Sequence, residues 1–227
     1  MENILLSYAE DLNDAYPGHE FSIWPRHKLL EYLNEALCLI AAQRPDLFTE
    51  IKVVKVDPCS NYLDLCDCNE ILDVLGQSDK NGRLIRALPE RSKKGTLWTG
   101  GSRFQDTFTT ELSEYEIIDR SNLVRVYPQN LDPTKDIYVL IRCSVDAKTY
   151  TLDDEPPSGR CAFMAAARHF VMYSAKMIDG EFSPAMLSAS KEHREMFFGI
   201  LQMSEAADEK ATDETAKYRE QNRRRTQ

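Results

Sequence analysis

The chain has 227 residues, 42% of them hydrophobic, and a formal net charge of −9. This composition is enough for a buried core, in one domain with an elaboration or in two small domains. An acidic chain lacks the surplus of Lys and Arg that wrapping nucleic acid requires, although it could enclose DNA without gripping it. The first residues do not resemble a signal peptide, and no apolar run approaches the roughly 18 residues of a membrane span. We therefore expect a soluble protein that is made in the cytoplasm and has no membrane contact.

Two amphipathic helices are predicted near the start of the chain. The first covers residues 1–15 and is broken by Tyr16-Pro17-Gly18. The second lies within residues 24–48, because Pro25 fits a first helical turn and Pro45 disfavours the helical conformation of the residue before it. Its apolar stripe consists of Leu29, Leu30, Leu33, Ala36, Leu37, Ile40 and Ala41.

Asn34 is an amide within this apolar stripe, four residues after Leu30 and three before Leu37. A buried carboxamide needs hydrogen-bond partners. We interpret Asn34 as a structural, buried polar residue that holds the backbone of a neighbouring loop.

The segment 49–155 has the pattern of β-strands. Short runs rich in β-branched and aromatic residues follow one another without helices between them, so we predict an antiparallel, β-rich region and an α+β fold. Asp119-Arg120-Ser121-Asn122 is the predicted hairpin turn. In the strand around Val139, Ile137, Val139, Ile141 and Cys143 alternate with Tyr138, Leu140 and Arg142, so we expect it to be covered on both faces or to lie in a subunit contact. The predicted strands are IKVVKV, NYLDL, EILDVLG, YEIID, LVRVYP and DIYVLIRCSV.

Two further helices are predicted after this region. An alanine-rich helix follows Pro156-Pro157 and ends at Asp179-Gly180, and a final amphipathic helix begins at Ser183-Pro184. We expect these helices to pack with the two N-terminal ones as a four-helix bundle. The expected organisation is a bundle of residues 1–48 and 156–203, a β-rich insertion of 49–155 and an extended C-terminal tail of 204–227.

The residue pattern does not indicate catalysis or a resident metal. Cys59, Cys66 and Cys68 lie close together but lack the paired spacing and the nearby fourth ligand of a zinc site. His169 and His193 lie near apolar stripes and are interpreted as core or interface histidines. The sequence motifs of hydrolases, metalloproteases and nucleotide-binding proteins do not occur. We therefore predict a protein that is not an enzyme, with no catalytic residues, metal or cofactor.

Two segments have charge patterns that indicate contact with partners. The chain is locally basic between Asp79 and Asp106. This segment has two interpretations: a surface that contacts a tail protein or DNA, or a solvated loop. Residues 204–227 are acidic first and basic afterwards, and alone they would form at most a frayed helix that another chain must hold. The basic segment contains Arg83, Arg86, Arg91, Lys93, Lys94, Trp98 and Arg103, and the tail contains Tyr218, Arg219, Arg223, Arg224 and Arg225.

An ordered set of residues carries a family resemblance. In the long N-terminal helix these residues are Trp24, Leu29, Leu30, Leu33, Asn34, Ala36, Arg44, Pro45 and Asp46, and in the β region they are Tyr115, Asp119, Val126, Tyr127 and Pro128, followed by the alanine-rich helical pair. Together they resemble the head-to-tail adaptor proteins of tailed phages, especially short-tailed ones. The resemblance covers residues 20–203, and the loop at 61–65 departs from the family pattern.

The resemblance implies a structural protein of the virion neck, a connector that forms a ring of about twelve copies beneath the portal protein. It implies that the β region faces a downstream tail or nozzle protein, that the C-terminal tail docks on the portal, and that genomic DNA passes through the lumen during packaging and ejection. An acidic lumen would repel the genome and let it slide. Two alternatives stay open: a metal-dependent hydrolase that uses the three close cysteines, and a small DNA-binding regulatory protein that uses the basic segment.

Overall fold

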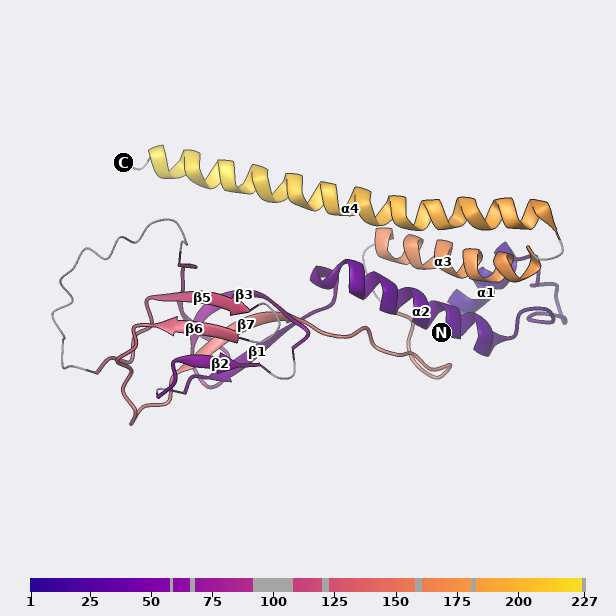
Figure 1. Cartoon of the computed structure of the whole chain (residues 1–227). Coiled ribbons are helices and arrows are strands. Elements are labelled where there is room, and N and C mark those ends of the chain that lie inside the picture. Colours follow the sequence, from indigo (N-terminus) through magenta and orange to yellow (C-terminus); the bar gives the residue numbers. More distant parts are fainter. Residues whose placement is uncertain are drawn as a thin grey trace. The chain divides into compact units, whose positions relative to one another are not determined.

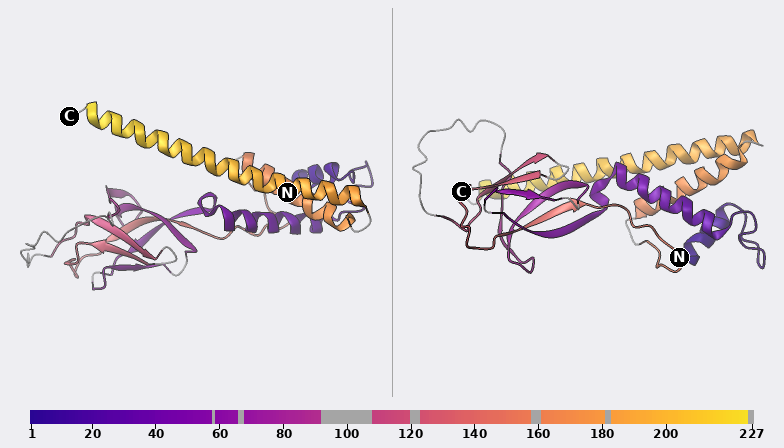
Figure 2. Two further views of the ribbon diagram at one scale, coloured as in Figure 1. Left: turned by 45° about the horizontal axis from the view of Figure 1, so that its top comes forward. Right: turned by 60° about the horizontal axis from the view of Figure 1, so that its bottom comes forward.

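The computed structural model describes residues 1–57, 59–65, 68–91, 108–119, 123–157, 161–180 and 183–225. The protein is α+β, with four α-helices and antiparallel sheets among these residues. The chain divides into two compact units. The helical unit contains residues 1–44 and 147–227, and the β unit contains residues 45–146. Figure 1 shows this grouping of helices and strands, and Figure 2 shows it from two further directions.

Helix α3 is central to the helical unit, because it contacts each of the other three helices. Small residues allow this close packing: Ala166, Ala167 and Ala175 of α3 are fully buried. Among the described helices, none is long and apolar enough to cross a membrane. The helices are α1 (Glu2–Asp11), α2 (Arg26–Gln43), α3 (Cys161–Asp179) and α4 (Pro184–Arg225).

The ends of the N-terminal helices follow from local chemistry. Pro25 precedes the first residue of α2, and Arg44 leaves the helical conformation at φ −129° and ψ 69°, as the proline after it requires. Helix α1 ends at Asp11, earlier than predicted, because Asn13 adopts a positive φ of 57° that a helix cannot contain.

The C-terminal segment differs from the expected extended tail. Its backbone is the second half of α4, a single helix of 42 residues that continues to Arg225. The residues from 204 onward are mainly Ala, Glu, Lys, Gln and Arg, which are good helix formers. The packed first half of α4 already supplies the helical nucleus, so extension does not incur the nucleation penalty that a separate tail would face.

The β unit contains two antiparallel sheets. The first has the strand order β1-β7-β3-β4 and the second the order β2-β6-β5. Strands β5 and β6 pair as the predicted hairpin, although the turn residues 120–122 lie outside the described part of the chain. A short 3-10 helix, Pro45–Leu47, precedes the first strand. The strands are β1 (Thr49–Lys55), β2 (Tyr62–Asp64), β3 (Glu70–Ser78), β4 (Leu84–Ala87), β5 (Glu114–Asp119), β6 (Leu123–Tyr127) and β7 (Tyr138–Ser144).

Residues from both sheets form one hydrophobic core. Strand β7 lies between β1 and β3, and its inward side chains Val139, Ile141 and Cys143 are fully buried. On its outer face Leu140 is half-buried and Arg142 is exposed, so the expectation that both faces are fully covered is only partly met within the chain.

Strand β4 was not predicted, because its residues belong to the segment that was interpreted as a basic loop. Asn81-Gly82, a strong hairpin signal, precedes it, and the Asp79 carboxylate accepts hydrogen bonds from the backbone N–H groups of Asn81 and Arg83. Gly76 makes the β3–β4 pairing possible: it has a φ of 149°, and a Cβ there would lie 2.1 Å from the carbonyl oxygen of Arg86.

Candidate functional site

A buried arginine joins the end of α2 to the middle of α4. The side chain of Arg44 is only 5% exposed, and its Nη2 lies 2.8 Å from Oδ2 of Asp208. Its Nη1 donates a 2.7 Å hydrogen bond to Oγ of Ser204, which in turn donates to the carbonyl oxygen of Leu201. A buried guanidinium is costly unless it is paired, so this contact ties the middle of α4 to the end of α2. We call Arg44, Ser204 and Asp208 the α2–α4 clamp.

Sequence reasoning assigned Arg44 to the end of a helix and to the family pattern, and it did not predict the contact with α4. Its partners lie 160 and 164 residues further along the chain. No local pattern relates residues that far apart. The only sequence signal was that a charged residue follows the apolar stripe of the helix.

Two more polar side chains position the segments around the helices. Both polar atoms of the Asn34 carboxamide bond to the backbone of Tyr150. Nδ2 donates to the Tyr150 carbonyl oxygen at 2.9 Å, and Oδ1 accepts from the Tyr150 N–H at 2.8 Å. Asn34 is half-buried, and it attaches the segment before α3 to α2. The buried carboxylate of Asp14, which sequence reasoning did not single out, accepts N–H hydrogen bonds from Ser22, Ile23 and Trp24 and so fixes the approach to α2.

The two helical histidines meet between α3 and α4. Nζ of Lys176 lies 2.9 Å from Nε2 of His193, and the Nδ1 atoms of His193 and His169 are 2.9 Å apart. An ammonium group only donates, so Nε2 of His193 accepts, and the His193 proton on Nδ1 is donated to His169. This chain of hydrogen bonds requires both rings to be neutral. Burial keeps the pKa of both histidines below the ordinary value of 6.5, and the neighbouring charges of Arg168 and Lys176 lower the pKa of His169 and His193, respectively.

The arginines of the basic segment are placed in part. Arg86 lies 3.4 Å from a carboxylate oxygen of Glu111, and Arg91 lies 3.8 Å from Glu114 and stacks over the ring of Tyr127. These acidic partners reduce the local positive charge. Arg83 forms part of the β3–β4 turn, and Lys93, Lys94, Trp98 and Arg103 lie outside the described residues.

The predicted tail residues lie on the last turns of α4. The backbone at Tyr218, Arg219, Arg223, Arg224 and Arg225 is helical, and their side chains lie outside what the structure describes. The structure therefore gives only their positions along the helix backbone.

The cysteines do not meet in the described part of the chain. Cys59 is exposed, Cys68 lies in the β core, and Cys66 is outside the described residues. Where the chain is described, no three His, Cys, Asp or Glu side chains are grouped closely enough to hold a metal ion.

Two residues that carry the family resemblance, Tyr115 and Tyr127, make hydrogen bonds within the β unit. Tyr115 is buried, and its hydroxyl lies 3.2 Å from a carboxylate oxygen of Asp73. Burial and the neighbouring carboxylate raise the pKa of Tyr115 to about 12. The hydroxyl of Tyr127 donates to Glu116.

In these contacts polar side chains hold segments of the chain in place. A protein-family model described as SU10 adaptor protein matches residues 3–225, so the chain belongs to the SU10 adaptor protein family. The resemblance to phage head-to-tail adaptors is confirmed, and the protein has the structural role of an adaptor. A search of curated proteins found no match to the chain.

The α2–α4 clamp gives a first prediction. Replacing Asp208 by Ala removes an anionic partner of a buried guanidinium, so we expect the free energy of unfolding to fall by about 1–3 kcal/mol, as measured by chemical denaturation. Glu205→Ala changes an exposed neighbour on the same helix and should change the stability by less than about 0.5 kcal/mol. Equal effects of the two substitutions would contradict the clamp.

The histidine pair predicts a pH dependence of stability. Because the pKa of each ring is lower in the folded chain than in the unfolded chain, the unfolded chain binds protons first as the pH falls below 6.5. Stability should therefore be greatest above this pH and decline below it. We expect His193→Gln to make the decline of the melting temperature shallower, and His27→Gln, at an exposed histidine, to leave it unchanged. A wild-type melting temperature that rises on acidification would refute the neutral pair.

Proposed function

We propose that the protein is the adaptor of a phage virion neck and forms a ring of about twelve copies beneath the portal protein. In this arrangement the C-terminal part of α4 docks on the portal, and the β unit meets a downstream tail or nozzle protein. Genomic DNA passes through the lumen without sequence-specific contact, since the chain carries a net charge of −9. Membership of the adaptor family supports this proposal.

The single observation that carries the portal contact is the length of α4. The clamp holds α4 at Ser204 and Asp208, and the helix then continues to Arg225. These remaining turns span roughly 25 Å. Figure 1 shows α4 running on beyond the ends of α2 and α3. We infer that the part of α4 after the clamp, residues 209–225, is a docking arm.

The sequence of the docking arm fits a partner that supplies acidic groups. It ends in Arg219, Arg223, Arg224 and Arg225. Positive charge is favourable at a helix C-terminus. The planar guanidinium group of arginine can form two parallel hydrogen bonds with one carboxylate. The arm has few large apolar residues, so a partner must supply most of the free energy that stabilises its helix. We therefore expect a free protein that is largely monomeric and forms its ring on the portal.

Truncation tests the docking arm. A chain ended after Lys210 keeps the clamp, so its melting temperature should stay within a few degrees of that of the full chain. Its affinity for purified portal rings should fall by more than about a hundredfold, equivalent to about 2.8 kcal/mol. Replacing Arg223, Arg224 and Arg225 by Glu should weaken attachment more at low than at high salt.

Full occupancy of the portal by the truncated chain would show that the arm is not the anchor. In that case the remaining helices or the β unit must make the contact. A stable ring of the full chain without portal would contradict the proposed order of assembly but leave the docking arm in place.

A further inference from the structure

Helix α4 has a second apolar face besides the one that packs inside the helical unit. Its members recur at steps of three, four and seven residues, the spacing of a helix–helix seam. Met196 is 51% exposed and Met203 is 75% exposed. Met side chains adapt to irregular partners, and such a row of exposed ones marks a contact surface. We call this face the methionine stripe; it consists of Ala189, Met196, Ile200, Met203 and Ala207.

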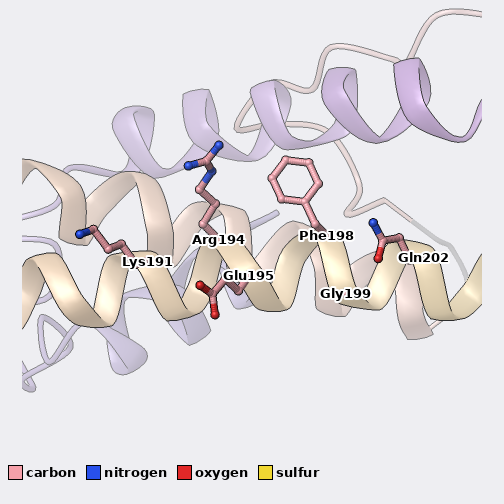
Figure 3. Close-up of a pocket in the computed structure, with 6 residues that line it drawn as sticks. All are labelled: Lys191, Arg194, Glu195, Phe198, Gly199 and Gln202. Carbon is pink, nitrogen blue, oxygen red and sulfur yellow. The ribbon is translucent and has the colours of Figure 1, made fainter.

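The opposite flank of α4 carries a groove. The described residues that line its volume of about 450 Å³ are Lys191, Arg194, Glu195, Phe198, Gly199 and Gln202. Phe198 forms its apolar wall and packs edge-on against the buried Phe197, with ring centroids 5.0 Å apart. Figure 3 shows Arg194 and Phe198 rising from the same side of the helix, while Glu195 points another way.

The stripe and the groove lie on different sides of one helix. Successive helical residues are about 100° apart, so Phe198 lies about 200° around the axis from Met196. Gly199 lies between the two faces, and a Cβ there would have nothing within 4 Å. The helix backbone is therefore open to close approach by another chain.

The two faces complement each other in shape and charge. The stripe projects flexible apolar side chains, and the groove is concave with an aromatic wall. Glu192 lies one turn before Met196 at the edge of the stripe, whereas Lys191 and Arg194 are at the rim of the groove, and all three are exposed. Opposite charges would therefore meet if the stripe of one copy entered the groove of the next.

We propose that the methionine stripe of one copy packs into the Phe198 groove of a second copy of this chain, and that this contact builds the ring. The inference rests on the proposed adaptor function. Two different faces on one subunit give a heterologous, head-to-tail contact, which closes into a ring when the rotation between copies allows. The stripe and the groove occupy the same stretch of α4, so copies related by rotation alone can match them without an axial shift.

Site-specific photocrosslinking tests this contact. The full chain carrying benzoylphenylalanine at Met203 is assembled on portal rings, irradiated, and its crosslinked peptides identified by mass spectrometry. We expect crosslinks to residues 191–202 of another copy. The same group at the exposed Glu35 of α2, which belongs to neither surface, is the control and should give few of them. Crosslinks to the portal, or between two stripes, would overturn the proposal, as would the absence of crosslinks between copies.

A charge exchange gives an independent readout. Glu192→Lys alone and Arg194→Glu alone should each reduce ring yield by about tenfold, because like charges then face each other. The double variant should restore the yield, which a merely destabilising substitution would not allow. A double variant no better than the singles overturns the proposed pairing.

Crosslinking of concentrated protein without portal separates the two proposals. Crosslinks from position 203 to the groove in that sample, with no binding to portal, would support the contact between copies and reject the adaptor assignment. Portal binding at full occupancy without any crosslink between copies would support the adaptor assignment and reject the contact between the stripe and the groove.

Discussion

The pairing of the buried Arg44 guanidinium with Asp208 and Ser204 is the constraint on which the helical unit depends. The Arg44 side chain is only 5% exposed, so shifting α4 along α2 would break a charge-assisted contact of a buried cation. The clamp also divides α4 into two parts. The first packs on α3 through residues such as Phe197, and the second continues beyond the clamp as the docking arm.

Features encoded in neighbouring residues could be predicted from the sequence. The prolines on either side of α2 and the apolar stripe between them predicted that helix, and runs of β-branched residues predicted six of the seven strands. The features that were missed have other causes. Arg44 and Asp208 lie 164 residues apart, so only the fold brings them together. Strand β4 follows an Asn81-Gly82 turn signal that was overlooked in favour of the basic charge. The helical tail was read as extended because its propensity was considered apart from the packed helix that precedes it.

The two units use polar residues in the same way, to hold irregular segments rather than to perform chemistry. Asp14 and Asn34 bond to backbone groups in the helical unit, and Asp79 does so in the β unit. The family match gives this arrangement its biological meaning, because an adaptor must hold its shape between two larger assemblies. The partner surfaces that we propose for the helical unit are the docking arm, the methionine stripe and the Phe198 groove, all on α4.

The central claim is that the clamp fixes α4 up to Asp208 and that the portal stabilises the helical arm beyond it. Backbone hydrogen exchange along α4, measured on the free protein and on the portal complex, tests it most directly. The account predicts slow exchange up to Asp208 in both samples, and slow exchange across residues 209–225 only in the complex. Equal protection of the arm with and without portal would contradict it.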